Sequence, residues 1–259
     1  MIVNHRFTLL VAGIAMLLGG LTLTPANADA QRDQNYYQAT QKFRIQLFGS
    51  SQKVTIPKGT VVMGRVMPID TATGTRQEAS FDLLTLNYQL KTKNGWPKKI
   101  HAGGGGETSA MNNVGRYLTP TTRPAYMLQQ AGELPVFART ATANYVTGAF
   151  ITVTTDGTLE SFSKTNKSRT RTQYRPTASA KITKFTQKGT KRYYYYQKKL
   201  TGVPGKRVAK HGKAQYRLTV TDLKQTKTVA QKHMSTAYYY HTYKFGKQTF
   251  YTYAGAAND

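Results

Sequence analysis

The stretch FITVTTDGTLESF, residues 150–162, decides the fold class of this chain. β-Branched and aromatic residues fill both halves of it, and such residues suit the pleated, half-buried surface of a strand. Asp156-Gly157 separates the two halves. Asp-Gly between strand-like runs is a strong hairpin signal, because a two-residue turn needs positive φ at both central positions. The stretch therefore predicts antiparallel strands over roughly 150–155 and 158–162.

The same pattern recurs on both sides of this hairpin. KVTIPKGTVV, residues 53–62, predicts a strand, a turn and a second strand. Residues 216–221 alternate, so that Tyr216, Leu218 and Val220 share one face and Arg217, Thr219 and Thr221 share the other. Helical patterns are scarce, and only 126–131 suggests about two helical turns. We therefore expect an all-β protein built of small sheets or SH3-like barrels.

Composition limits the classes of protein to which this chain can belong. It has 259 residues, of which 37 are Lys or Arg and 11 are Asp or Glu, and its formal net charge is +26. The absence of cysteine excludes a disulfide scaffold, thiolate metal sites and cysteine nucleophiles. Hydrophobic residues make up 39%, and 22 Gly bring the apolar share close to that of a globular domain.

The first 30 residues have the pattern of a cleaved signal peptide. Arg6 supplies a positive charge, and the uncharged run 7–23 follows it. Ala28-Asp29-Ala30 places small residues at the positions that a signal peptidase reads, so we expect cleavage after Ala30; cleavage after Ala28 and an uncleaved membrane anchor are the alternatives. No second apolar run reaches spanning length. The mature chain is therefore expected to be secreted, without a membrane span, and associated with the cell surface.

Charge is unevenly distributed along the rest of the chain. Residues 31–160 hold 14 basic and 8 acidic side chains, whereas 161–259 hold 22 basic and 2 acidic ones together with 12 of the 18 Tyr. Residues 164–180 are polar and basic, as is typical of a linker. We therefore predict two domains after the signal peptide: an N-terminal β domain over 31–163 and a basic, Tyr-rich domain over 181–259.

Catalytic signals are weak. Asp82 with Glu107, near the lone Trp96, is the one carboxylate pair that merits attention for glycoside hydrolysis. Within the basic region only Asp222 is available to orient a histidine, and no nucleophile-elbow motif accompanies it. We therefore predict a non-enzymatic protein with no catalytic residues, no metal site and no cofactor, and we keep a wall hydrolase as the alternative.

Binding signals are strong in the basic region, where cations alternate with aromatic rings. Strand side chains alternate between faces, so at least two of the four consecutive tyrosines 193–196 should stay partly exposed. Exposed Tyr stacks on sugars or bases, and dense Lys and Arg attract polyanions. The candidate ligand-binding residues are Lys191, Arg192, Tyr193, Tyr194, Tyr195, Tyr196, Lys198, Lys199, Lys206, Arg207, Tyr238, Tyr239 and Tyr240.

The expected export points to the class of partner. Nucleic acid would satisfy the same charges, but the signal peptide and the lack of a nucleic-acid motif argue against it. An exported chain without Cys fits a Gram-positive bacterium. Anionic polymers or peptidoglycan of the cell wall are therefore the expected partners.

The signal peptide, the lack of Cys, the basic Tyr-rich tail and the segment 54–62 together resemble secreted cell-surface proteins of lactobacilli. The C-terminal modules of those proteins are of the surface-layer or bacterial SH3-like type, and GKQTFY at 246–251 meets part of their repeated pattern. The resemblance implies noncovalent attachment to the wall. The alternatives are a peptidoglycan- or glycan-active hydrolase with the same anchor, and an adhesin for host mucin or matrix.

Overall fold

The computed structural model describes residues 35–46, 51–72, 74–82, 85–94, 114–127, 136–141, 147–163, 175–230 and 236–258. Strands dominate these ranges, which contain two short helices, α1 (Tyr88–Lys93) and α2 (Val114–Tyr117). The predicted all-β class is therefore confirmed. The predicted signal peptide lies outside the described residues. Of the predicted helical stretch 126–131, Tyr126 and Met127 lie in a turn, and the rest is outside the described residues.

None of the helices in the described ranges is long and apolar enough to cross a membrane.

The predicted hairpin is present. Strands β8 (Thr147–Val153) and β9 (Thr158–Phe162) are antiparallel, with Phe150 opposite Phe162 and Val153 opposite Leu159. Both strands pack apolar side chains into the interior, and every residue of β9 is buried. The local sequence thus determines this pair of strands, as expected.

The turn of the hairpin differs from the prediction. The N–H of Gly157 donates to the carbonyl of Thr154 at 2.9 Å, and the N–H of Thr154 donates to the carbonyl of Thr158 at 2.9 Å. Gly157 has φ of 73°, whereas Asp156 is not among the residues with positive φ. The connection is therefore a three-residue loop ending in a left-handed glycine. Asp156 instead accepts from the hydroxyls of Thr154 and Thr158, which fixes the loop.

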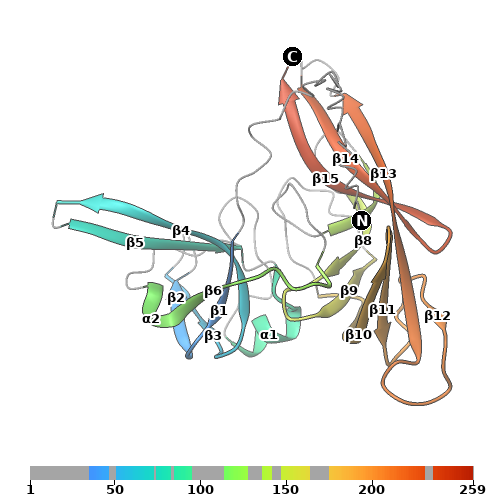
Figure 1. Ribbon diagram of the computed structural model, residues 1–259, viewed down its shortest axis with the longest axis horizontal. Helices are drawn as coiled ribbons and strands as arrows, with labels where there is room; N and C mark the ends of the chain where they lie inside the picture. Colours follow the sequence, from blue (N-terminus) through green and yellow to red (C-terminus); the bar gives the residue numbers. More distant parts are fainter. Residues whose placement is uncertain are drawn as a thin grey trace, which may run out of the picture.

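The hairpin belongs to a nine-stranded sheet of order β11-β10-β9-β8-β7-β15-β14-β13-β12, in which neighbours are antiparallel. β11 pairs additionally with β13, so β13 lies between β11 and β14 (Figure 1). The other strands are β7 (Val136–Thr140), β10 (Ala178–Lys188), β11 (Lys191–Tyr196), β12 (Lys206–Arg207), β13 (Tyr216–Ala230), β14 (Thr236–Phe245) and β15 (Gln248–Asn258).

These strands share one hydrophobic core. Its buried members come from β7, β8, β9, β11, β13, β14 and β15 and from the loop after β11. Aromatic rings make up a large part of it, including Phe137, which packs edge-on against Tyr243 and at 4.7 Å from Phe245. The predicted alternation over 216–221 is confirmed, because Leu218 and Val220 are buried in this core.

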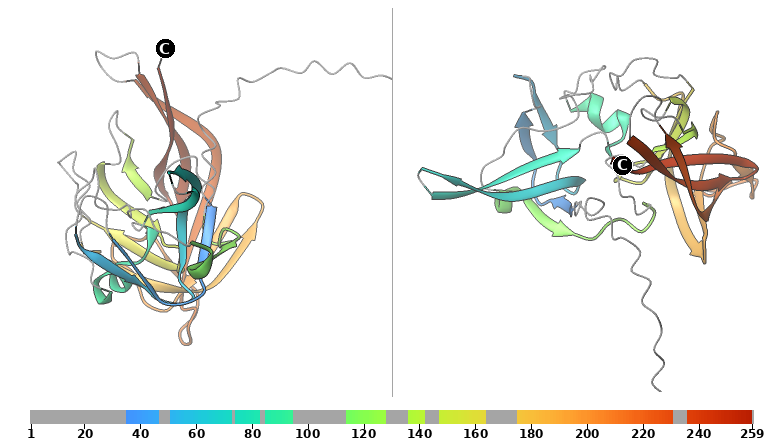
Figure 2. Two further views of the ribbon diagram at one scale, coloured as in Figure 1. Left: turned by 90° about the vertical axis from the view of Figure 1, so that its left-hand side faces the viewer. Right: turned by 90° about the horizontal axis from the view of Figure 1, so that it is seen from above.

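The N-terminal part has a second core. A four-stranded sheet of order β5-β4-β1-β6 and a separate hairpin, β2-β3, enclose it. The right-hand view of Figure 2 shows the blue and cyan strands of this part on one side of the molecule and the orange and red strands on the other. The strands are β1 (Asn35–Ala39), β2 (Phe43–Gln46), β3 (Lys53–Ile56), β4 (Val61–Thr71), β5 (Gly74–Asp82) and β6 (Leu118–Thr121).

The predicted strand-turn-strand over 53–62 is present as β3, a turn at Gly59 and β4. Its two strands do not pair with each other. β3 pairs with β2, and β4 pairs with β1 and β5. The turn therefore leads the chain from one sheet into the other.

The nine-stranded sheet includes strands from both sides of the predicted linker 164–180. β9 pairs with β10, with Ser161 opposite Ala178, and residues 178–180 are the first residues of β10. The predicted boundary is thus not a boundary between sheets. The SH3-like barrel and the two-domain division stay predictions.

Candidate functional site

Strand register defines one outward face on β10, β11, β12, β13 and β14. In Figure 1, β10, β11 and β12 lie by the lower part of β13, and β14 lies along its upper part. Residues directly opposite each other on neighbouring strands share a face. One row runs Lys184, Tyr195, Arg217, Lys206, and another runs Lys188, Lys191, Thr221, Lys244. Between them lies Tyr193, opposite Thr186 and Thr219. We call this surface the basic aromatic face; its members are Lys184, Lys188, Lys191, Tyr193, Tyr195, Lys206, Arg217 and Lys244.

Two tyrosine rings of the basic aromatic face form cation–π contacts with side chains of the same face. The guanidinium carbon of Arg217 lies 5.1 Å from the centroid of the Tyr193 ring, and Nζ of Lys184 lies 5.5 Å from that of Tyr195. Such contacts are worth about 0.5–1 kcal/mol at exposed sites. Both rings are partly exposed. The tyrosines therefore hold cations against the surface of the sheet.

The two other tyrosines of β11 point inward. Tyr194 and Tyr196 are fully buried, so the prediction that at least two of the four rings stay partly exposed is confirmed for Tyr193 and Tyr195. The Tyr194 hydroxyl donates to the carbonyl of Tyr126 at 2.9 Å, and burial raises the pKa of Tyr194 to about 12. The candidate set is corrected here: Tyr194 and Tyr196 are core residues, because alternation turns them away from the surface.

Several further candidates also lie off the basic aromatic face. Arg192 shares the inward side of β11, and its Nη1 donates to the carbonyl of Met127 at 3.3 Å. Arg207 bonds the carbonyls of Ala209 and Lys210 in its own loop. Lys198 and Lys199 are exposed in the loop after β11. These cations are near the face in sequence but are not part of its rows.

The second tyrosine run is placed elsewhere. Tyr238 and Tyr239 are partly exposed on β14, whereas Tyr240 is fully buried and so is removed from the candidate set. Their partners on β13 are residues 227–229, whereas β11 pairs with residues 216–221. At about 3.3 Å per residue, this offset puts the two runs roughly 20 Å or more apart along β13. The structure thus does not bring 193–196 and 238–240 into one site.

Reasoning from the sequence missed four members of the face: Lys184, Lys188, Arg217 and Lys244. One signal was present, because the alternation over 216–221 already placed Arg217 opposite the core face. The pairing of β13 with β11 and of β11 with β10 was not visible in the sequence. Sequence neighbours of the tyrosines were therefore chosen in place of their neighbours across the sheet.

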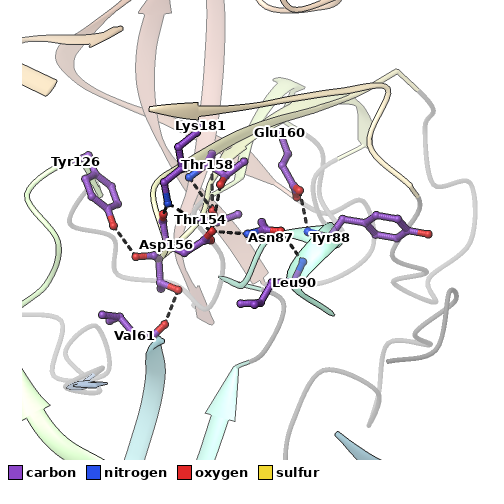
Figure 3. Close-up of polar contacts among 11 residues, drawn as sticks. Val61, Asn87, Tyr88, Leu90, Tyr126, Thr154, Asp156, Thr158, Glu160 and Lys181 are labelled. Carbon is purple, nitrogen blue, oxygen red and sulfur yellow. Dashed lines mark hydrogen bonds and ion pairs between the residues drawn. The ribbon is translucent and has the colours of Figure 1, made fainter. Parts of the chain in front are cut away.

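The loop of the β8–β9 hairpin forms a separate polar junction between the two cores (Figure 3). Thr155 donates its N–H to the carbonyl of Thr85 at 2.9 Å and its hydroxyl to the carbonyl of Val61 at 2.6 Å. The Asn87 side-chain amide donates to the carboxylate of Asp156. Because Asn87 also accepts from the N–H of Leu90 at 2.7 Å, it caps α1 and ties that helix to the hairpin.

Glu160 is the buried carboxylate of this junction. It is 1% exposed, and its Oε1 accepts from the N–H of Tyr88 at 2.8 Å. Burial raises the pKa of Glu160 to about 6; Lys91 and the Tyr88 N–H act in the opposite direction, and Asp156 raises it further. These contacts hold the start of α1 against β9, which is a structural role.

The described residues do not show whether Asp82 and Glu107, the carboxylate pair considered for hydrolysis, lie close together. Asp82 is the last residue of β5, and Glu107 lies outside the described residues. Within the described ranges, no group of three His, Asp or Glu side chains is arranged to hold a metal ion.

Comparisons of this chain with protein-family models, with curated proteins and with solved structures found no match.

Proposed function

We propose that this protein is a secreted cell-surface protein that attaches noncovalently to the Gram-positive cell wall. The observation that carries the proposal is the basic aromatic face, on which each row contains three cations and none of the register partners is acidic. A surface of one sign of charge concentrates polyanions near it. Anionic wall polymers are the partner that fits both this charge and the predicted export.

Placement on a sheet favours binding to an extended polymer. Six cations lie on strands that neighbour one another, so their spacing is fixed by the backbone. The tyrosines hold two of them in place. A polymer with repeated anionic groups can contact several cations at once, and many weak contacts then give useful affinity.

The test compares wall binding by the full chain and by two variants with equal charge change. One variant replaces four exposed lysines of the face with Gln: Lys184, Lys188, Lys191 and Lys206. The matched control replaces four exposed cations around the β2–β3 hairpin with Gln: Lys42, Arg44, Lys53 and Lys58. Surface charge contacts contribute about 0.2–1 kcal/mol each. We therefore expect the first variant to bind walls about tenfold more weakly or worse, and the control to change binding by less than about threefold.

The ligand is assigned by treating the walls before binding. Removal of anionic polymers by acid should abolish binding while leaving peptidoglycan intact. Equal loss in both variants would mean that net charge alone acts, and would contradict a role for this face. Binding that persists on stripped walls would contradict the anionic polymer. A preference for mucin over walls would favour an adhesin.

A further inference from the structure

We propose that Arg217 forms a phosphate-binding subsite on the basic aromatic face, with Lys206 beside it and Lys184 beyond Tyr195 in the same row. The proposal rests on the proposed function and deepens it, because it names the anionic group that the face recognises and the residue that recognises it. Arg217 was not among the candidates chosen from the sequence.

The guanidinium of Arg217 is held in place by its surroundings. It lies over the ring of Tyr193 at 5.1 Å, and the side chain as a whole is only partly exposed. Its Nε is buried, and no described residue accepts a hydrogen bond from that atom. The inner edge of the group is therefore covered, and its orientation is set by the Tyr193 ring below it.

The charge of Arg217 is not neutralised by a described carboxylate. In the described ranges, ion pairs are formed by Lys181 with Asp156 and by Lys224 with Asp222. The register partners of Arg217 on the two sides are Tyr195 and Lys206, so the nearest charge across the sheet has the same sign. A half-buried cation beside another cation favours an added anion.

The chemistry of the group points to an oxyanion that offers two acceptor oxygens. Arginine presents its donors in a rigid fork that matches carboxylate or phosphate in bidentate fashion, whereas lysine acts as a point charge; the wall polymers of the proposed function favour phosphate as the group that binds. A guanidinium already fixed on a ring loses little further freedom on binding. Arg217 thus supplies the geometry, and Lys206 and Lys184 supply further charge in the same row.

The arrangement of the rows favours a phosphate polymer over a carbohydrate stacked on tyrosine. The rings of Tyr193 and Tyr195 already have cations near one face, which leaves them poorly suited as open platforms for sugars. The row at Lys184 and the row at Lys188 lie four residues apart, or about 13 Å along the strand. A chain with one phosphate in each repeat can reach both rows.

The test uses conservative substitutions that keep the charge. Arg217→Lys removes the planar fork, and Arg207→Lys makes the same exchange at an exposed arginine that bonds its own loop. The probes are a glycerol-phosphate oligomer, poly-glutamate of similar charge and an uncharged N-acetylglucosamine oligomer, each titrated into the full chain by calorimetry. Thermal unfolding of each variant checks that the fold is kept.

We expect Arg217→Lys to weaken binding of the glycerol-phosphate oligomer about tenfold and Arg207→Lys to leave it within about twofold, since the first exchange removes a charge-assisted hydrogen bond to the phosphate. Tyr193→Phe should keep the affinity, because it keeps the ring, and Tyr193→Leu should lower it. Poly-glutamate should bind more weakly.

Three results would overturn the subsite. These are equal affinity of Arg217→Lys and the unchanged chain for the phosphate oligomer, equal binding of poly-glutamate, and binding of the uncharged oligomer that depends on Tyr193. In each of these cases the proposed function survives if the four-lysine variant still loses wall binding. Failure of the unchanged chain to bind walls would instead overturn the proposed function itself.

Discussion

The hydroxyl of Tyr196 occupies the space that a side chain at Gly205 would need. A Cβ at Gly205 would lie 1.8 Å from that oxygen and 3.0 Å from Cζ of the same ring. Tyr196 is fully buried and stacks on Tyr216, with ring centroids 6.0 Å apart, so it has little room to move. The loop between β11 and β12 can close over the core only because position 205 has no side chain.

Gly205→Ala should therefore destabilise the fold. Overpacking of a well-packed core costs about 1–3 kcal/mol. Gly115→Ala is the matched control, because a Cβ there meets nothing within 4 Å and neither glycine has a φ in the left-handed region. Urea unfolding should show a loss of stability for the first variant and none for the second. Equal stability of the two variants would contradict the steric conflict.

Tyr196→Phe should rescue Gly205→Ala in part. The exchange removes the oxygen at 1.8 Å and leaves the ring carbon at 3.0 Å. By itself it should change stability little, because no described group bonds the buried Tyr196 hydroxyl. A double-mutant cycle measures the coupling, which should be favourable and on the order of 1 kcal/mol. Simple additivity of the two substitutions would show that the conflict lies elsewhere.

Local patterns predicted the strands but not their partners. The β8–β9 hairpin and the alternation over 216–221 depend on residues close in sequence, and both are present. The pairing of Lys184 with Tyr195 and of Tyr195 with Arg217 depends on strand register between three separate strands. No local property of those residues sets that register, so the basic aromatic face was only half visible in the sequence.

The uneven distribution of charge along the sequence predicted a basic surface but did not predict which strands pair. The change in composition near residue 161 placed a linker at 164–180, yet the strands on its two sides are neighbours in one sheet. Side chains of β7, β8 and β9 are needed to complete a core whose other half is Tyr-rich. Solvent-facing lysines carry no information about such contacts.

A fragment comprising residues 181–259 should therefore fail to fold cooperatively. It lacks Phe137, Ile151 and Leu159 of the shared core and the carbonyl of Tyr126 that accepts from Tyr194. A fragment over 120–259 keeps all of these groups and is the control. Near-ultraviolet circular dichroism during urea unfolding should show a sharp transition for the longer fragment alone. A native-like transition in the shorter one would support a domain boundary at 164–180.

Glu160 should make stability fall as pH rises. Its pKa of about 6 in the folded state exceeds the ordinary value of 4.5, so between these values the folded state binds more protons than the unfolded state. Stability is then lost as pH rises through this window, by on the order of 2 kcal/mol.

Glu160→Gln, which keeps an acceptor for the N–H of Tyr88, removes this titration. The unfolding free energy of the unchanged chain minus that of the variant should fall between pH 4.5 and 6 and be constant above about pH 7. The subtraction cancels the contribution of other titrating groups. A difference that does not change with pH would mean that Glu160 does not hold its proton in the folded state.

Salt should weaken wall binding in proportion to the number of cations that contact the polymer. Exposed charges are screened over about 10 Å at 0.1 M ionic strength and about 3 Å at 1 M. Each phosphate contact also releases a counterion, so the logarithm of the binding constant falls linearly with the logarithm of the salt concentration. The slope therefore counts contacts, whereas stacking of a sugar on a ring would leave it near zero.

The two four-residue variants separate the face from the net charge by this slope. Replacing Lys184, Lys188, Lys191 and Lys206 should reduce the slope by up to about 3, because each contact contributes somewhat less than one. The control at Lys42, Arg44, Lys53 and Lys58 should leave the slope unchanged, although its net charge is the same. A reduced slope in both variants would mean that the polymer contacts the whole surface. An unchanged slope in both would show that the replaced lysines of β10, β11 and β12 do not contact the polymer. The exposed cations of the loop at 197–200 and of residues 208–213 would then be the candidates for contact.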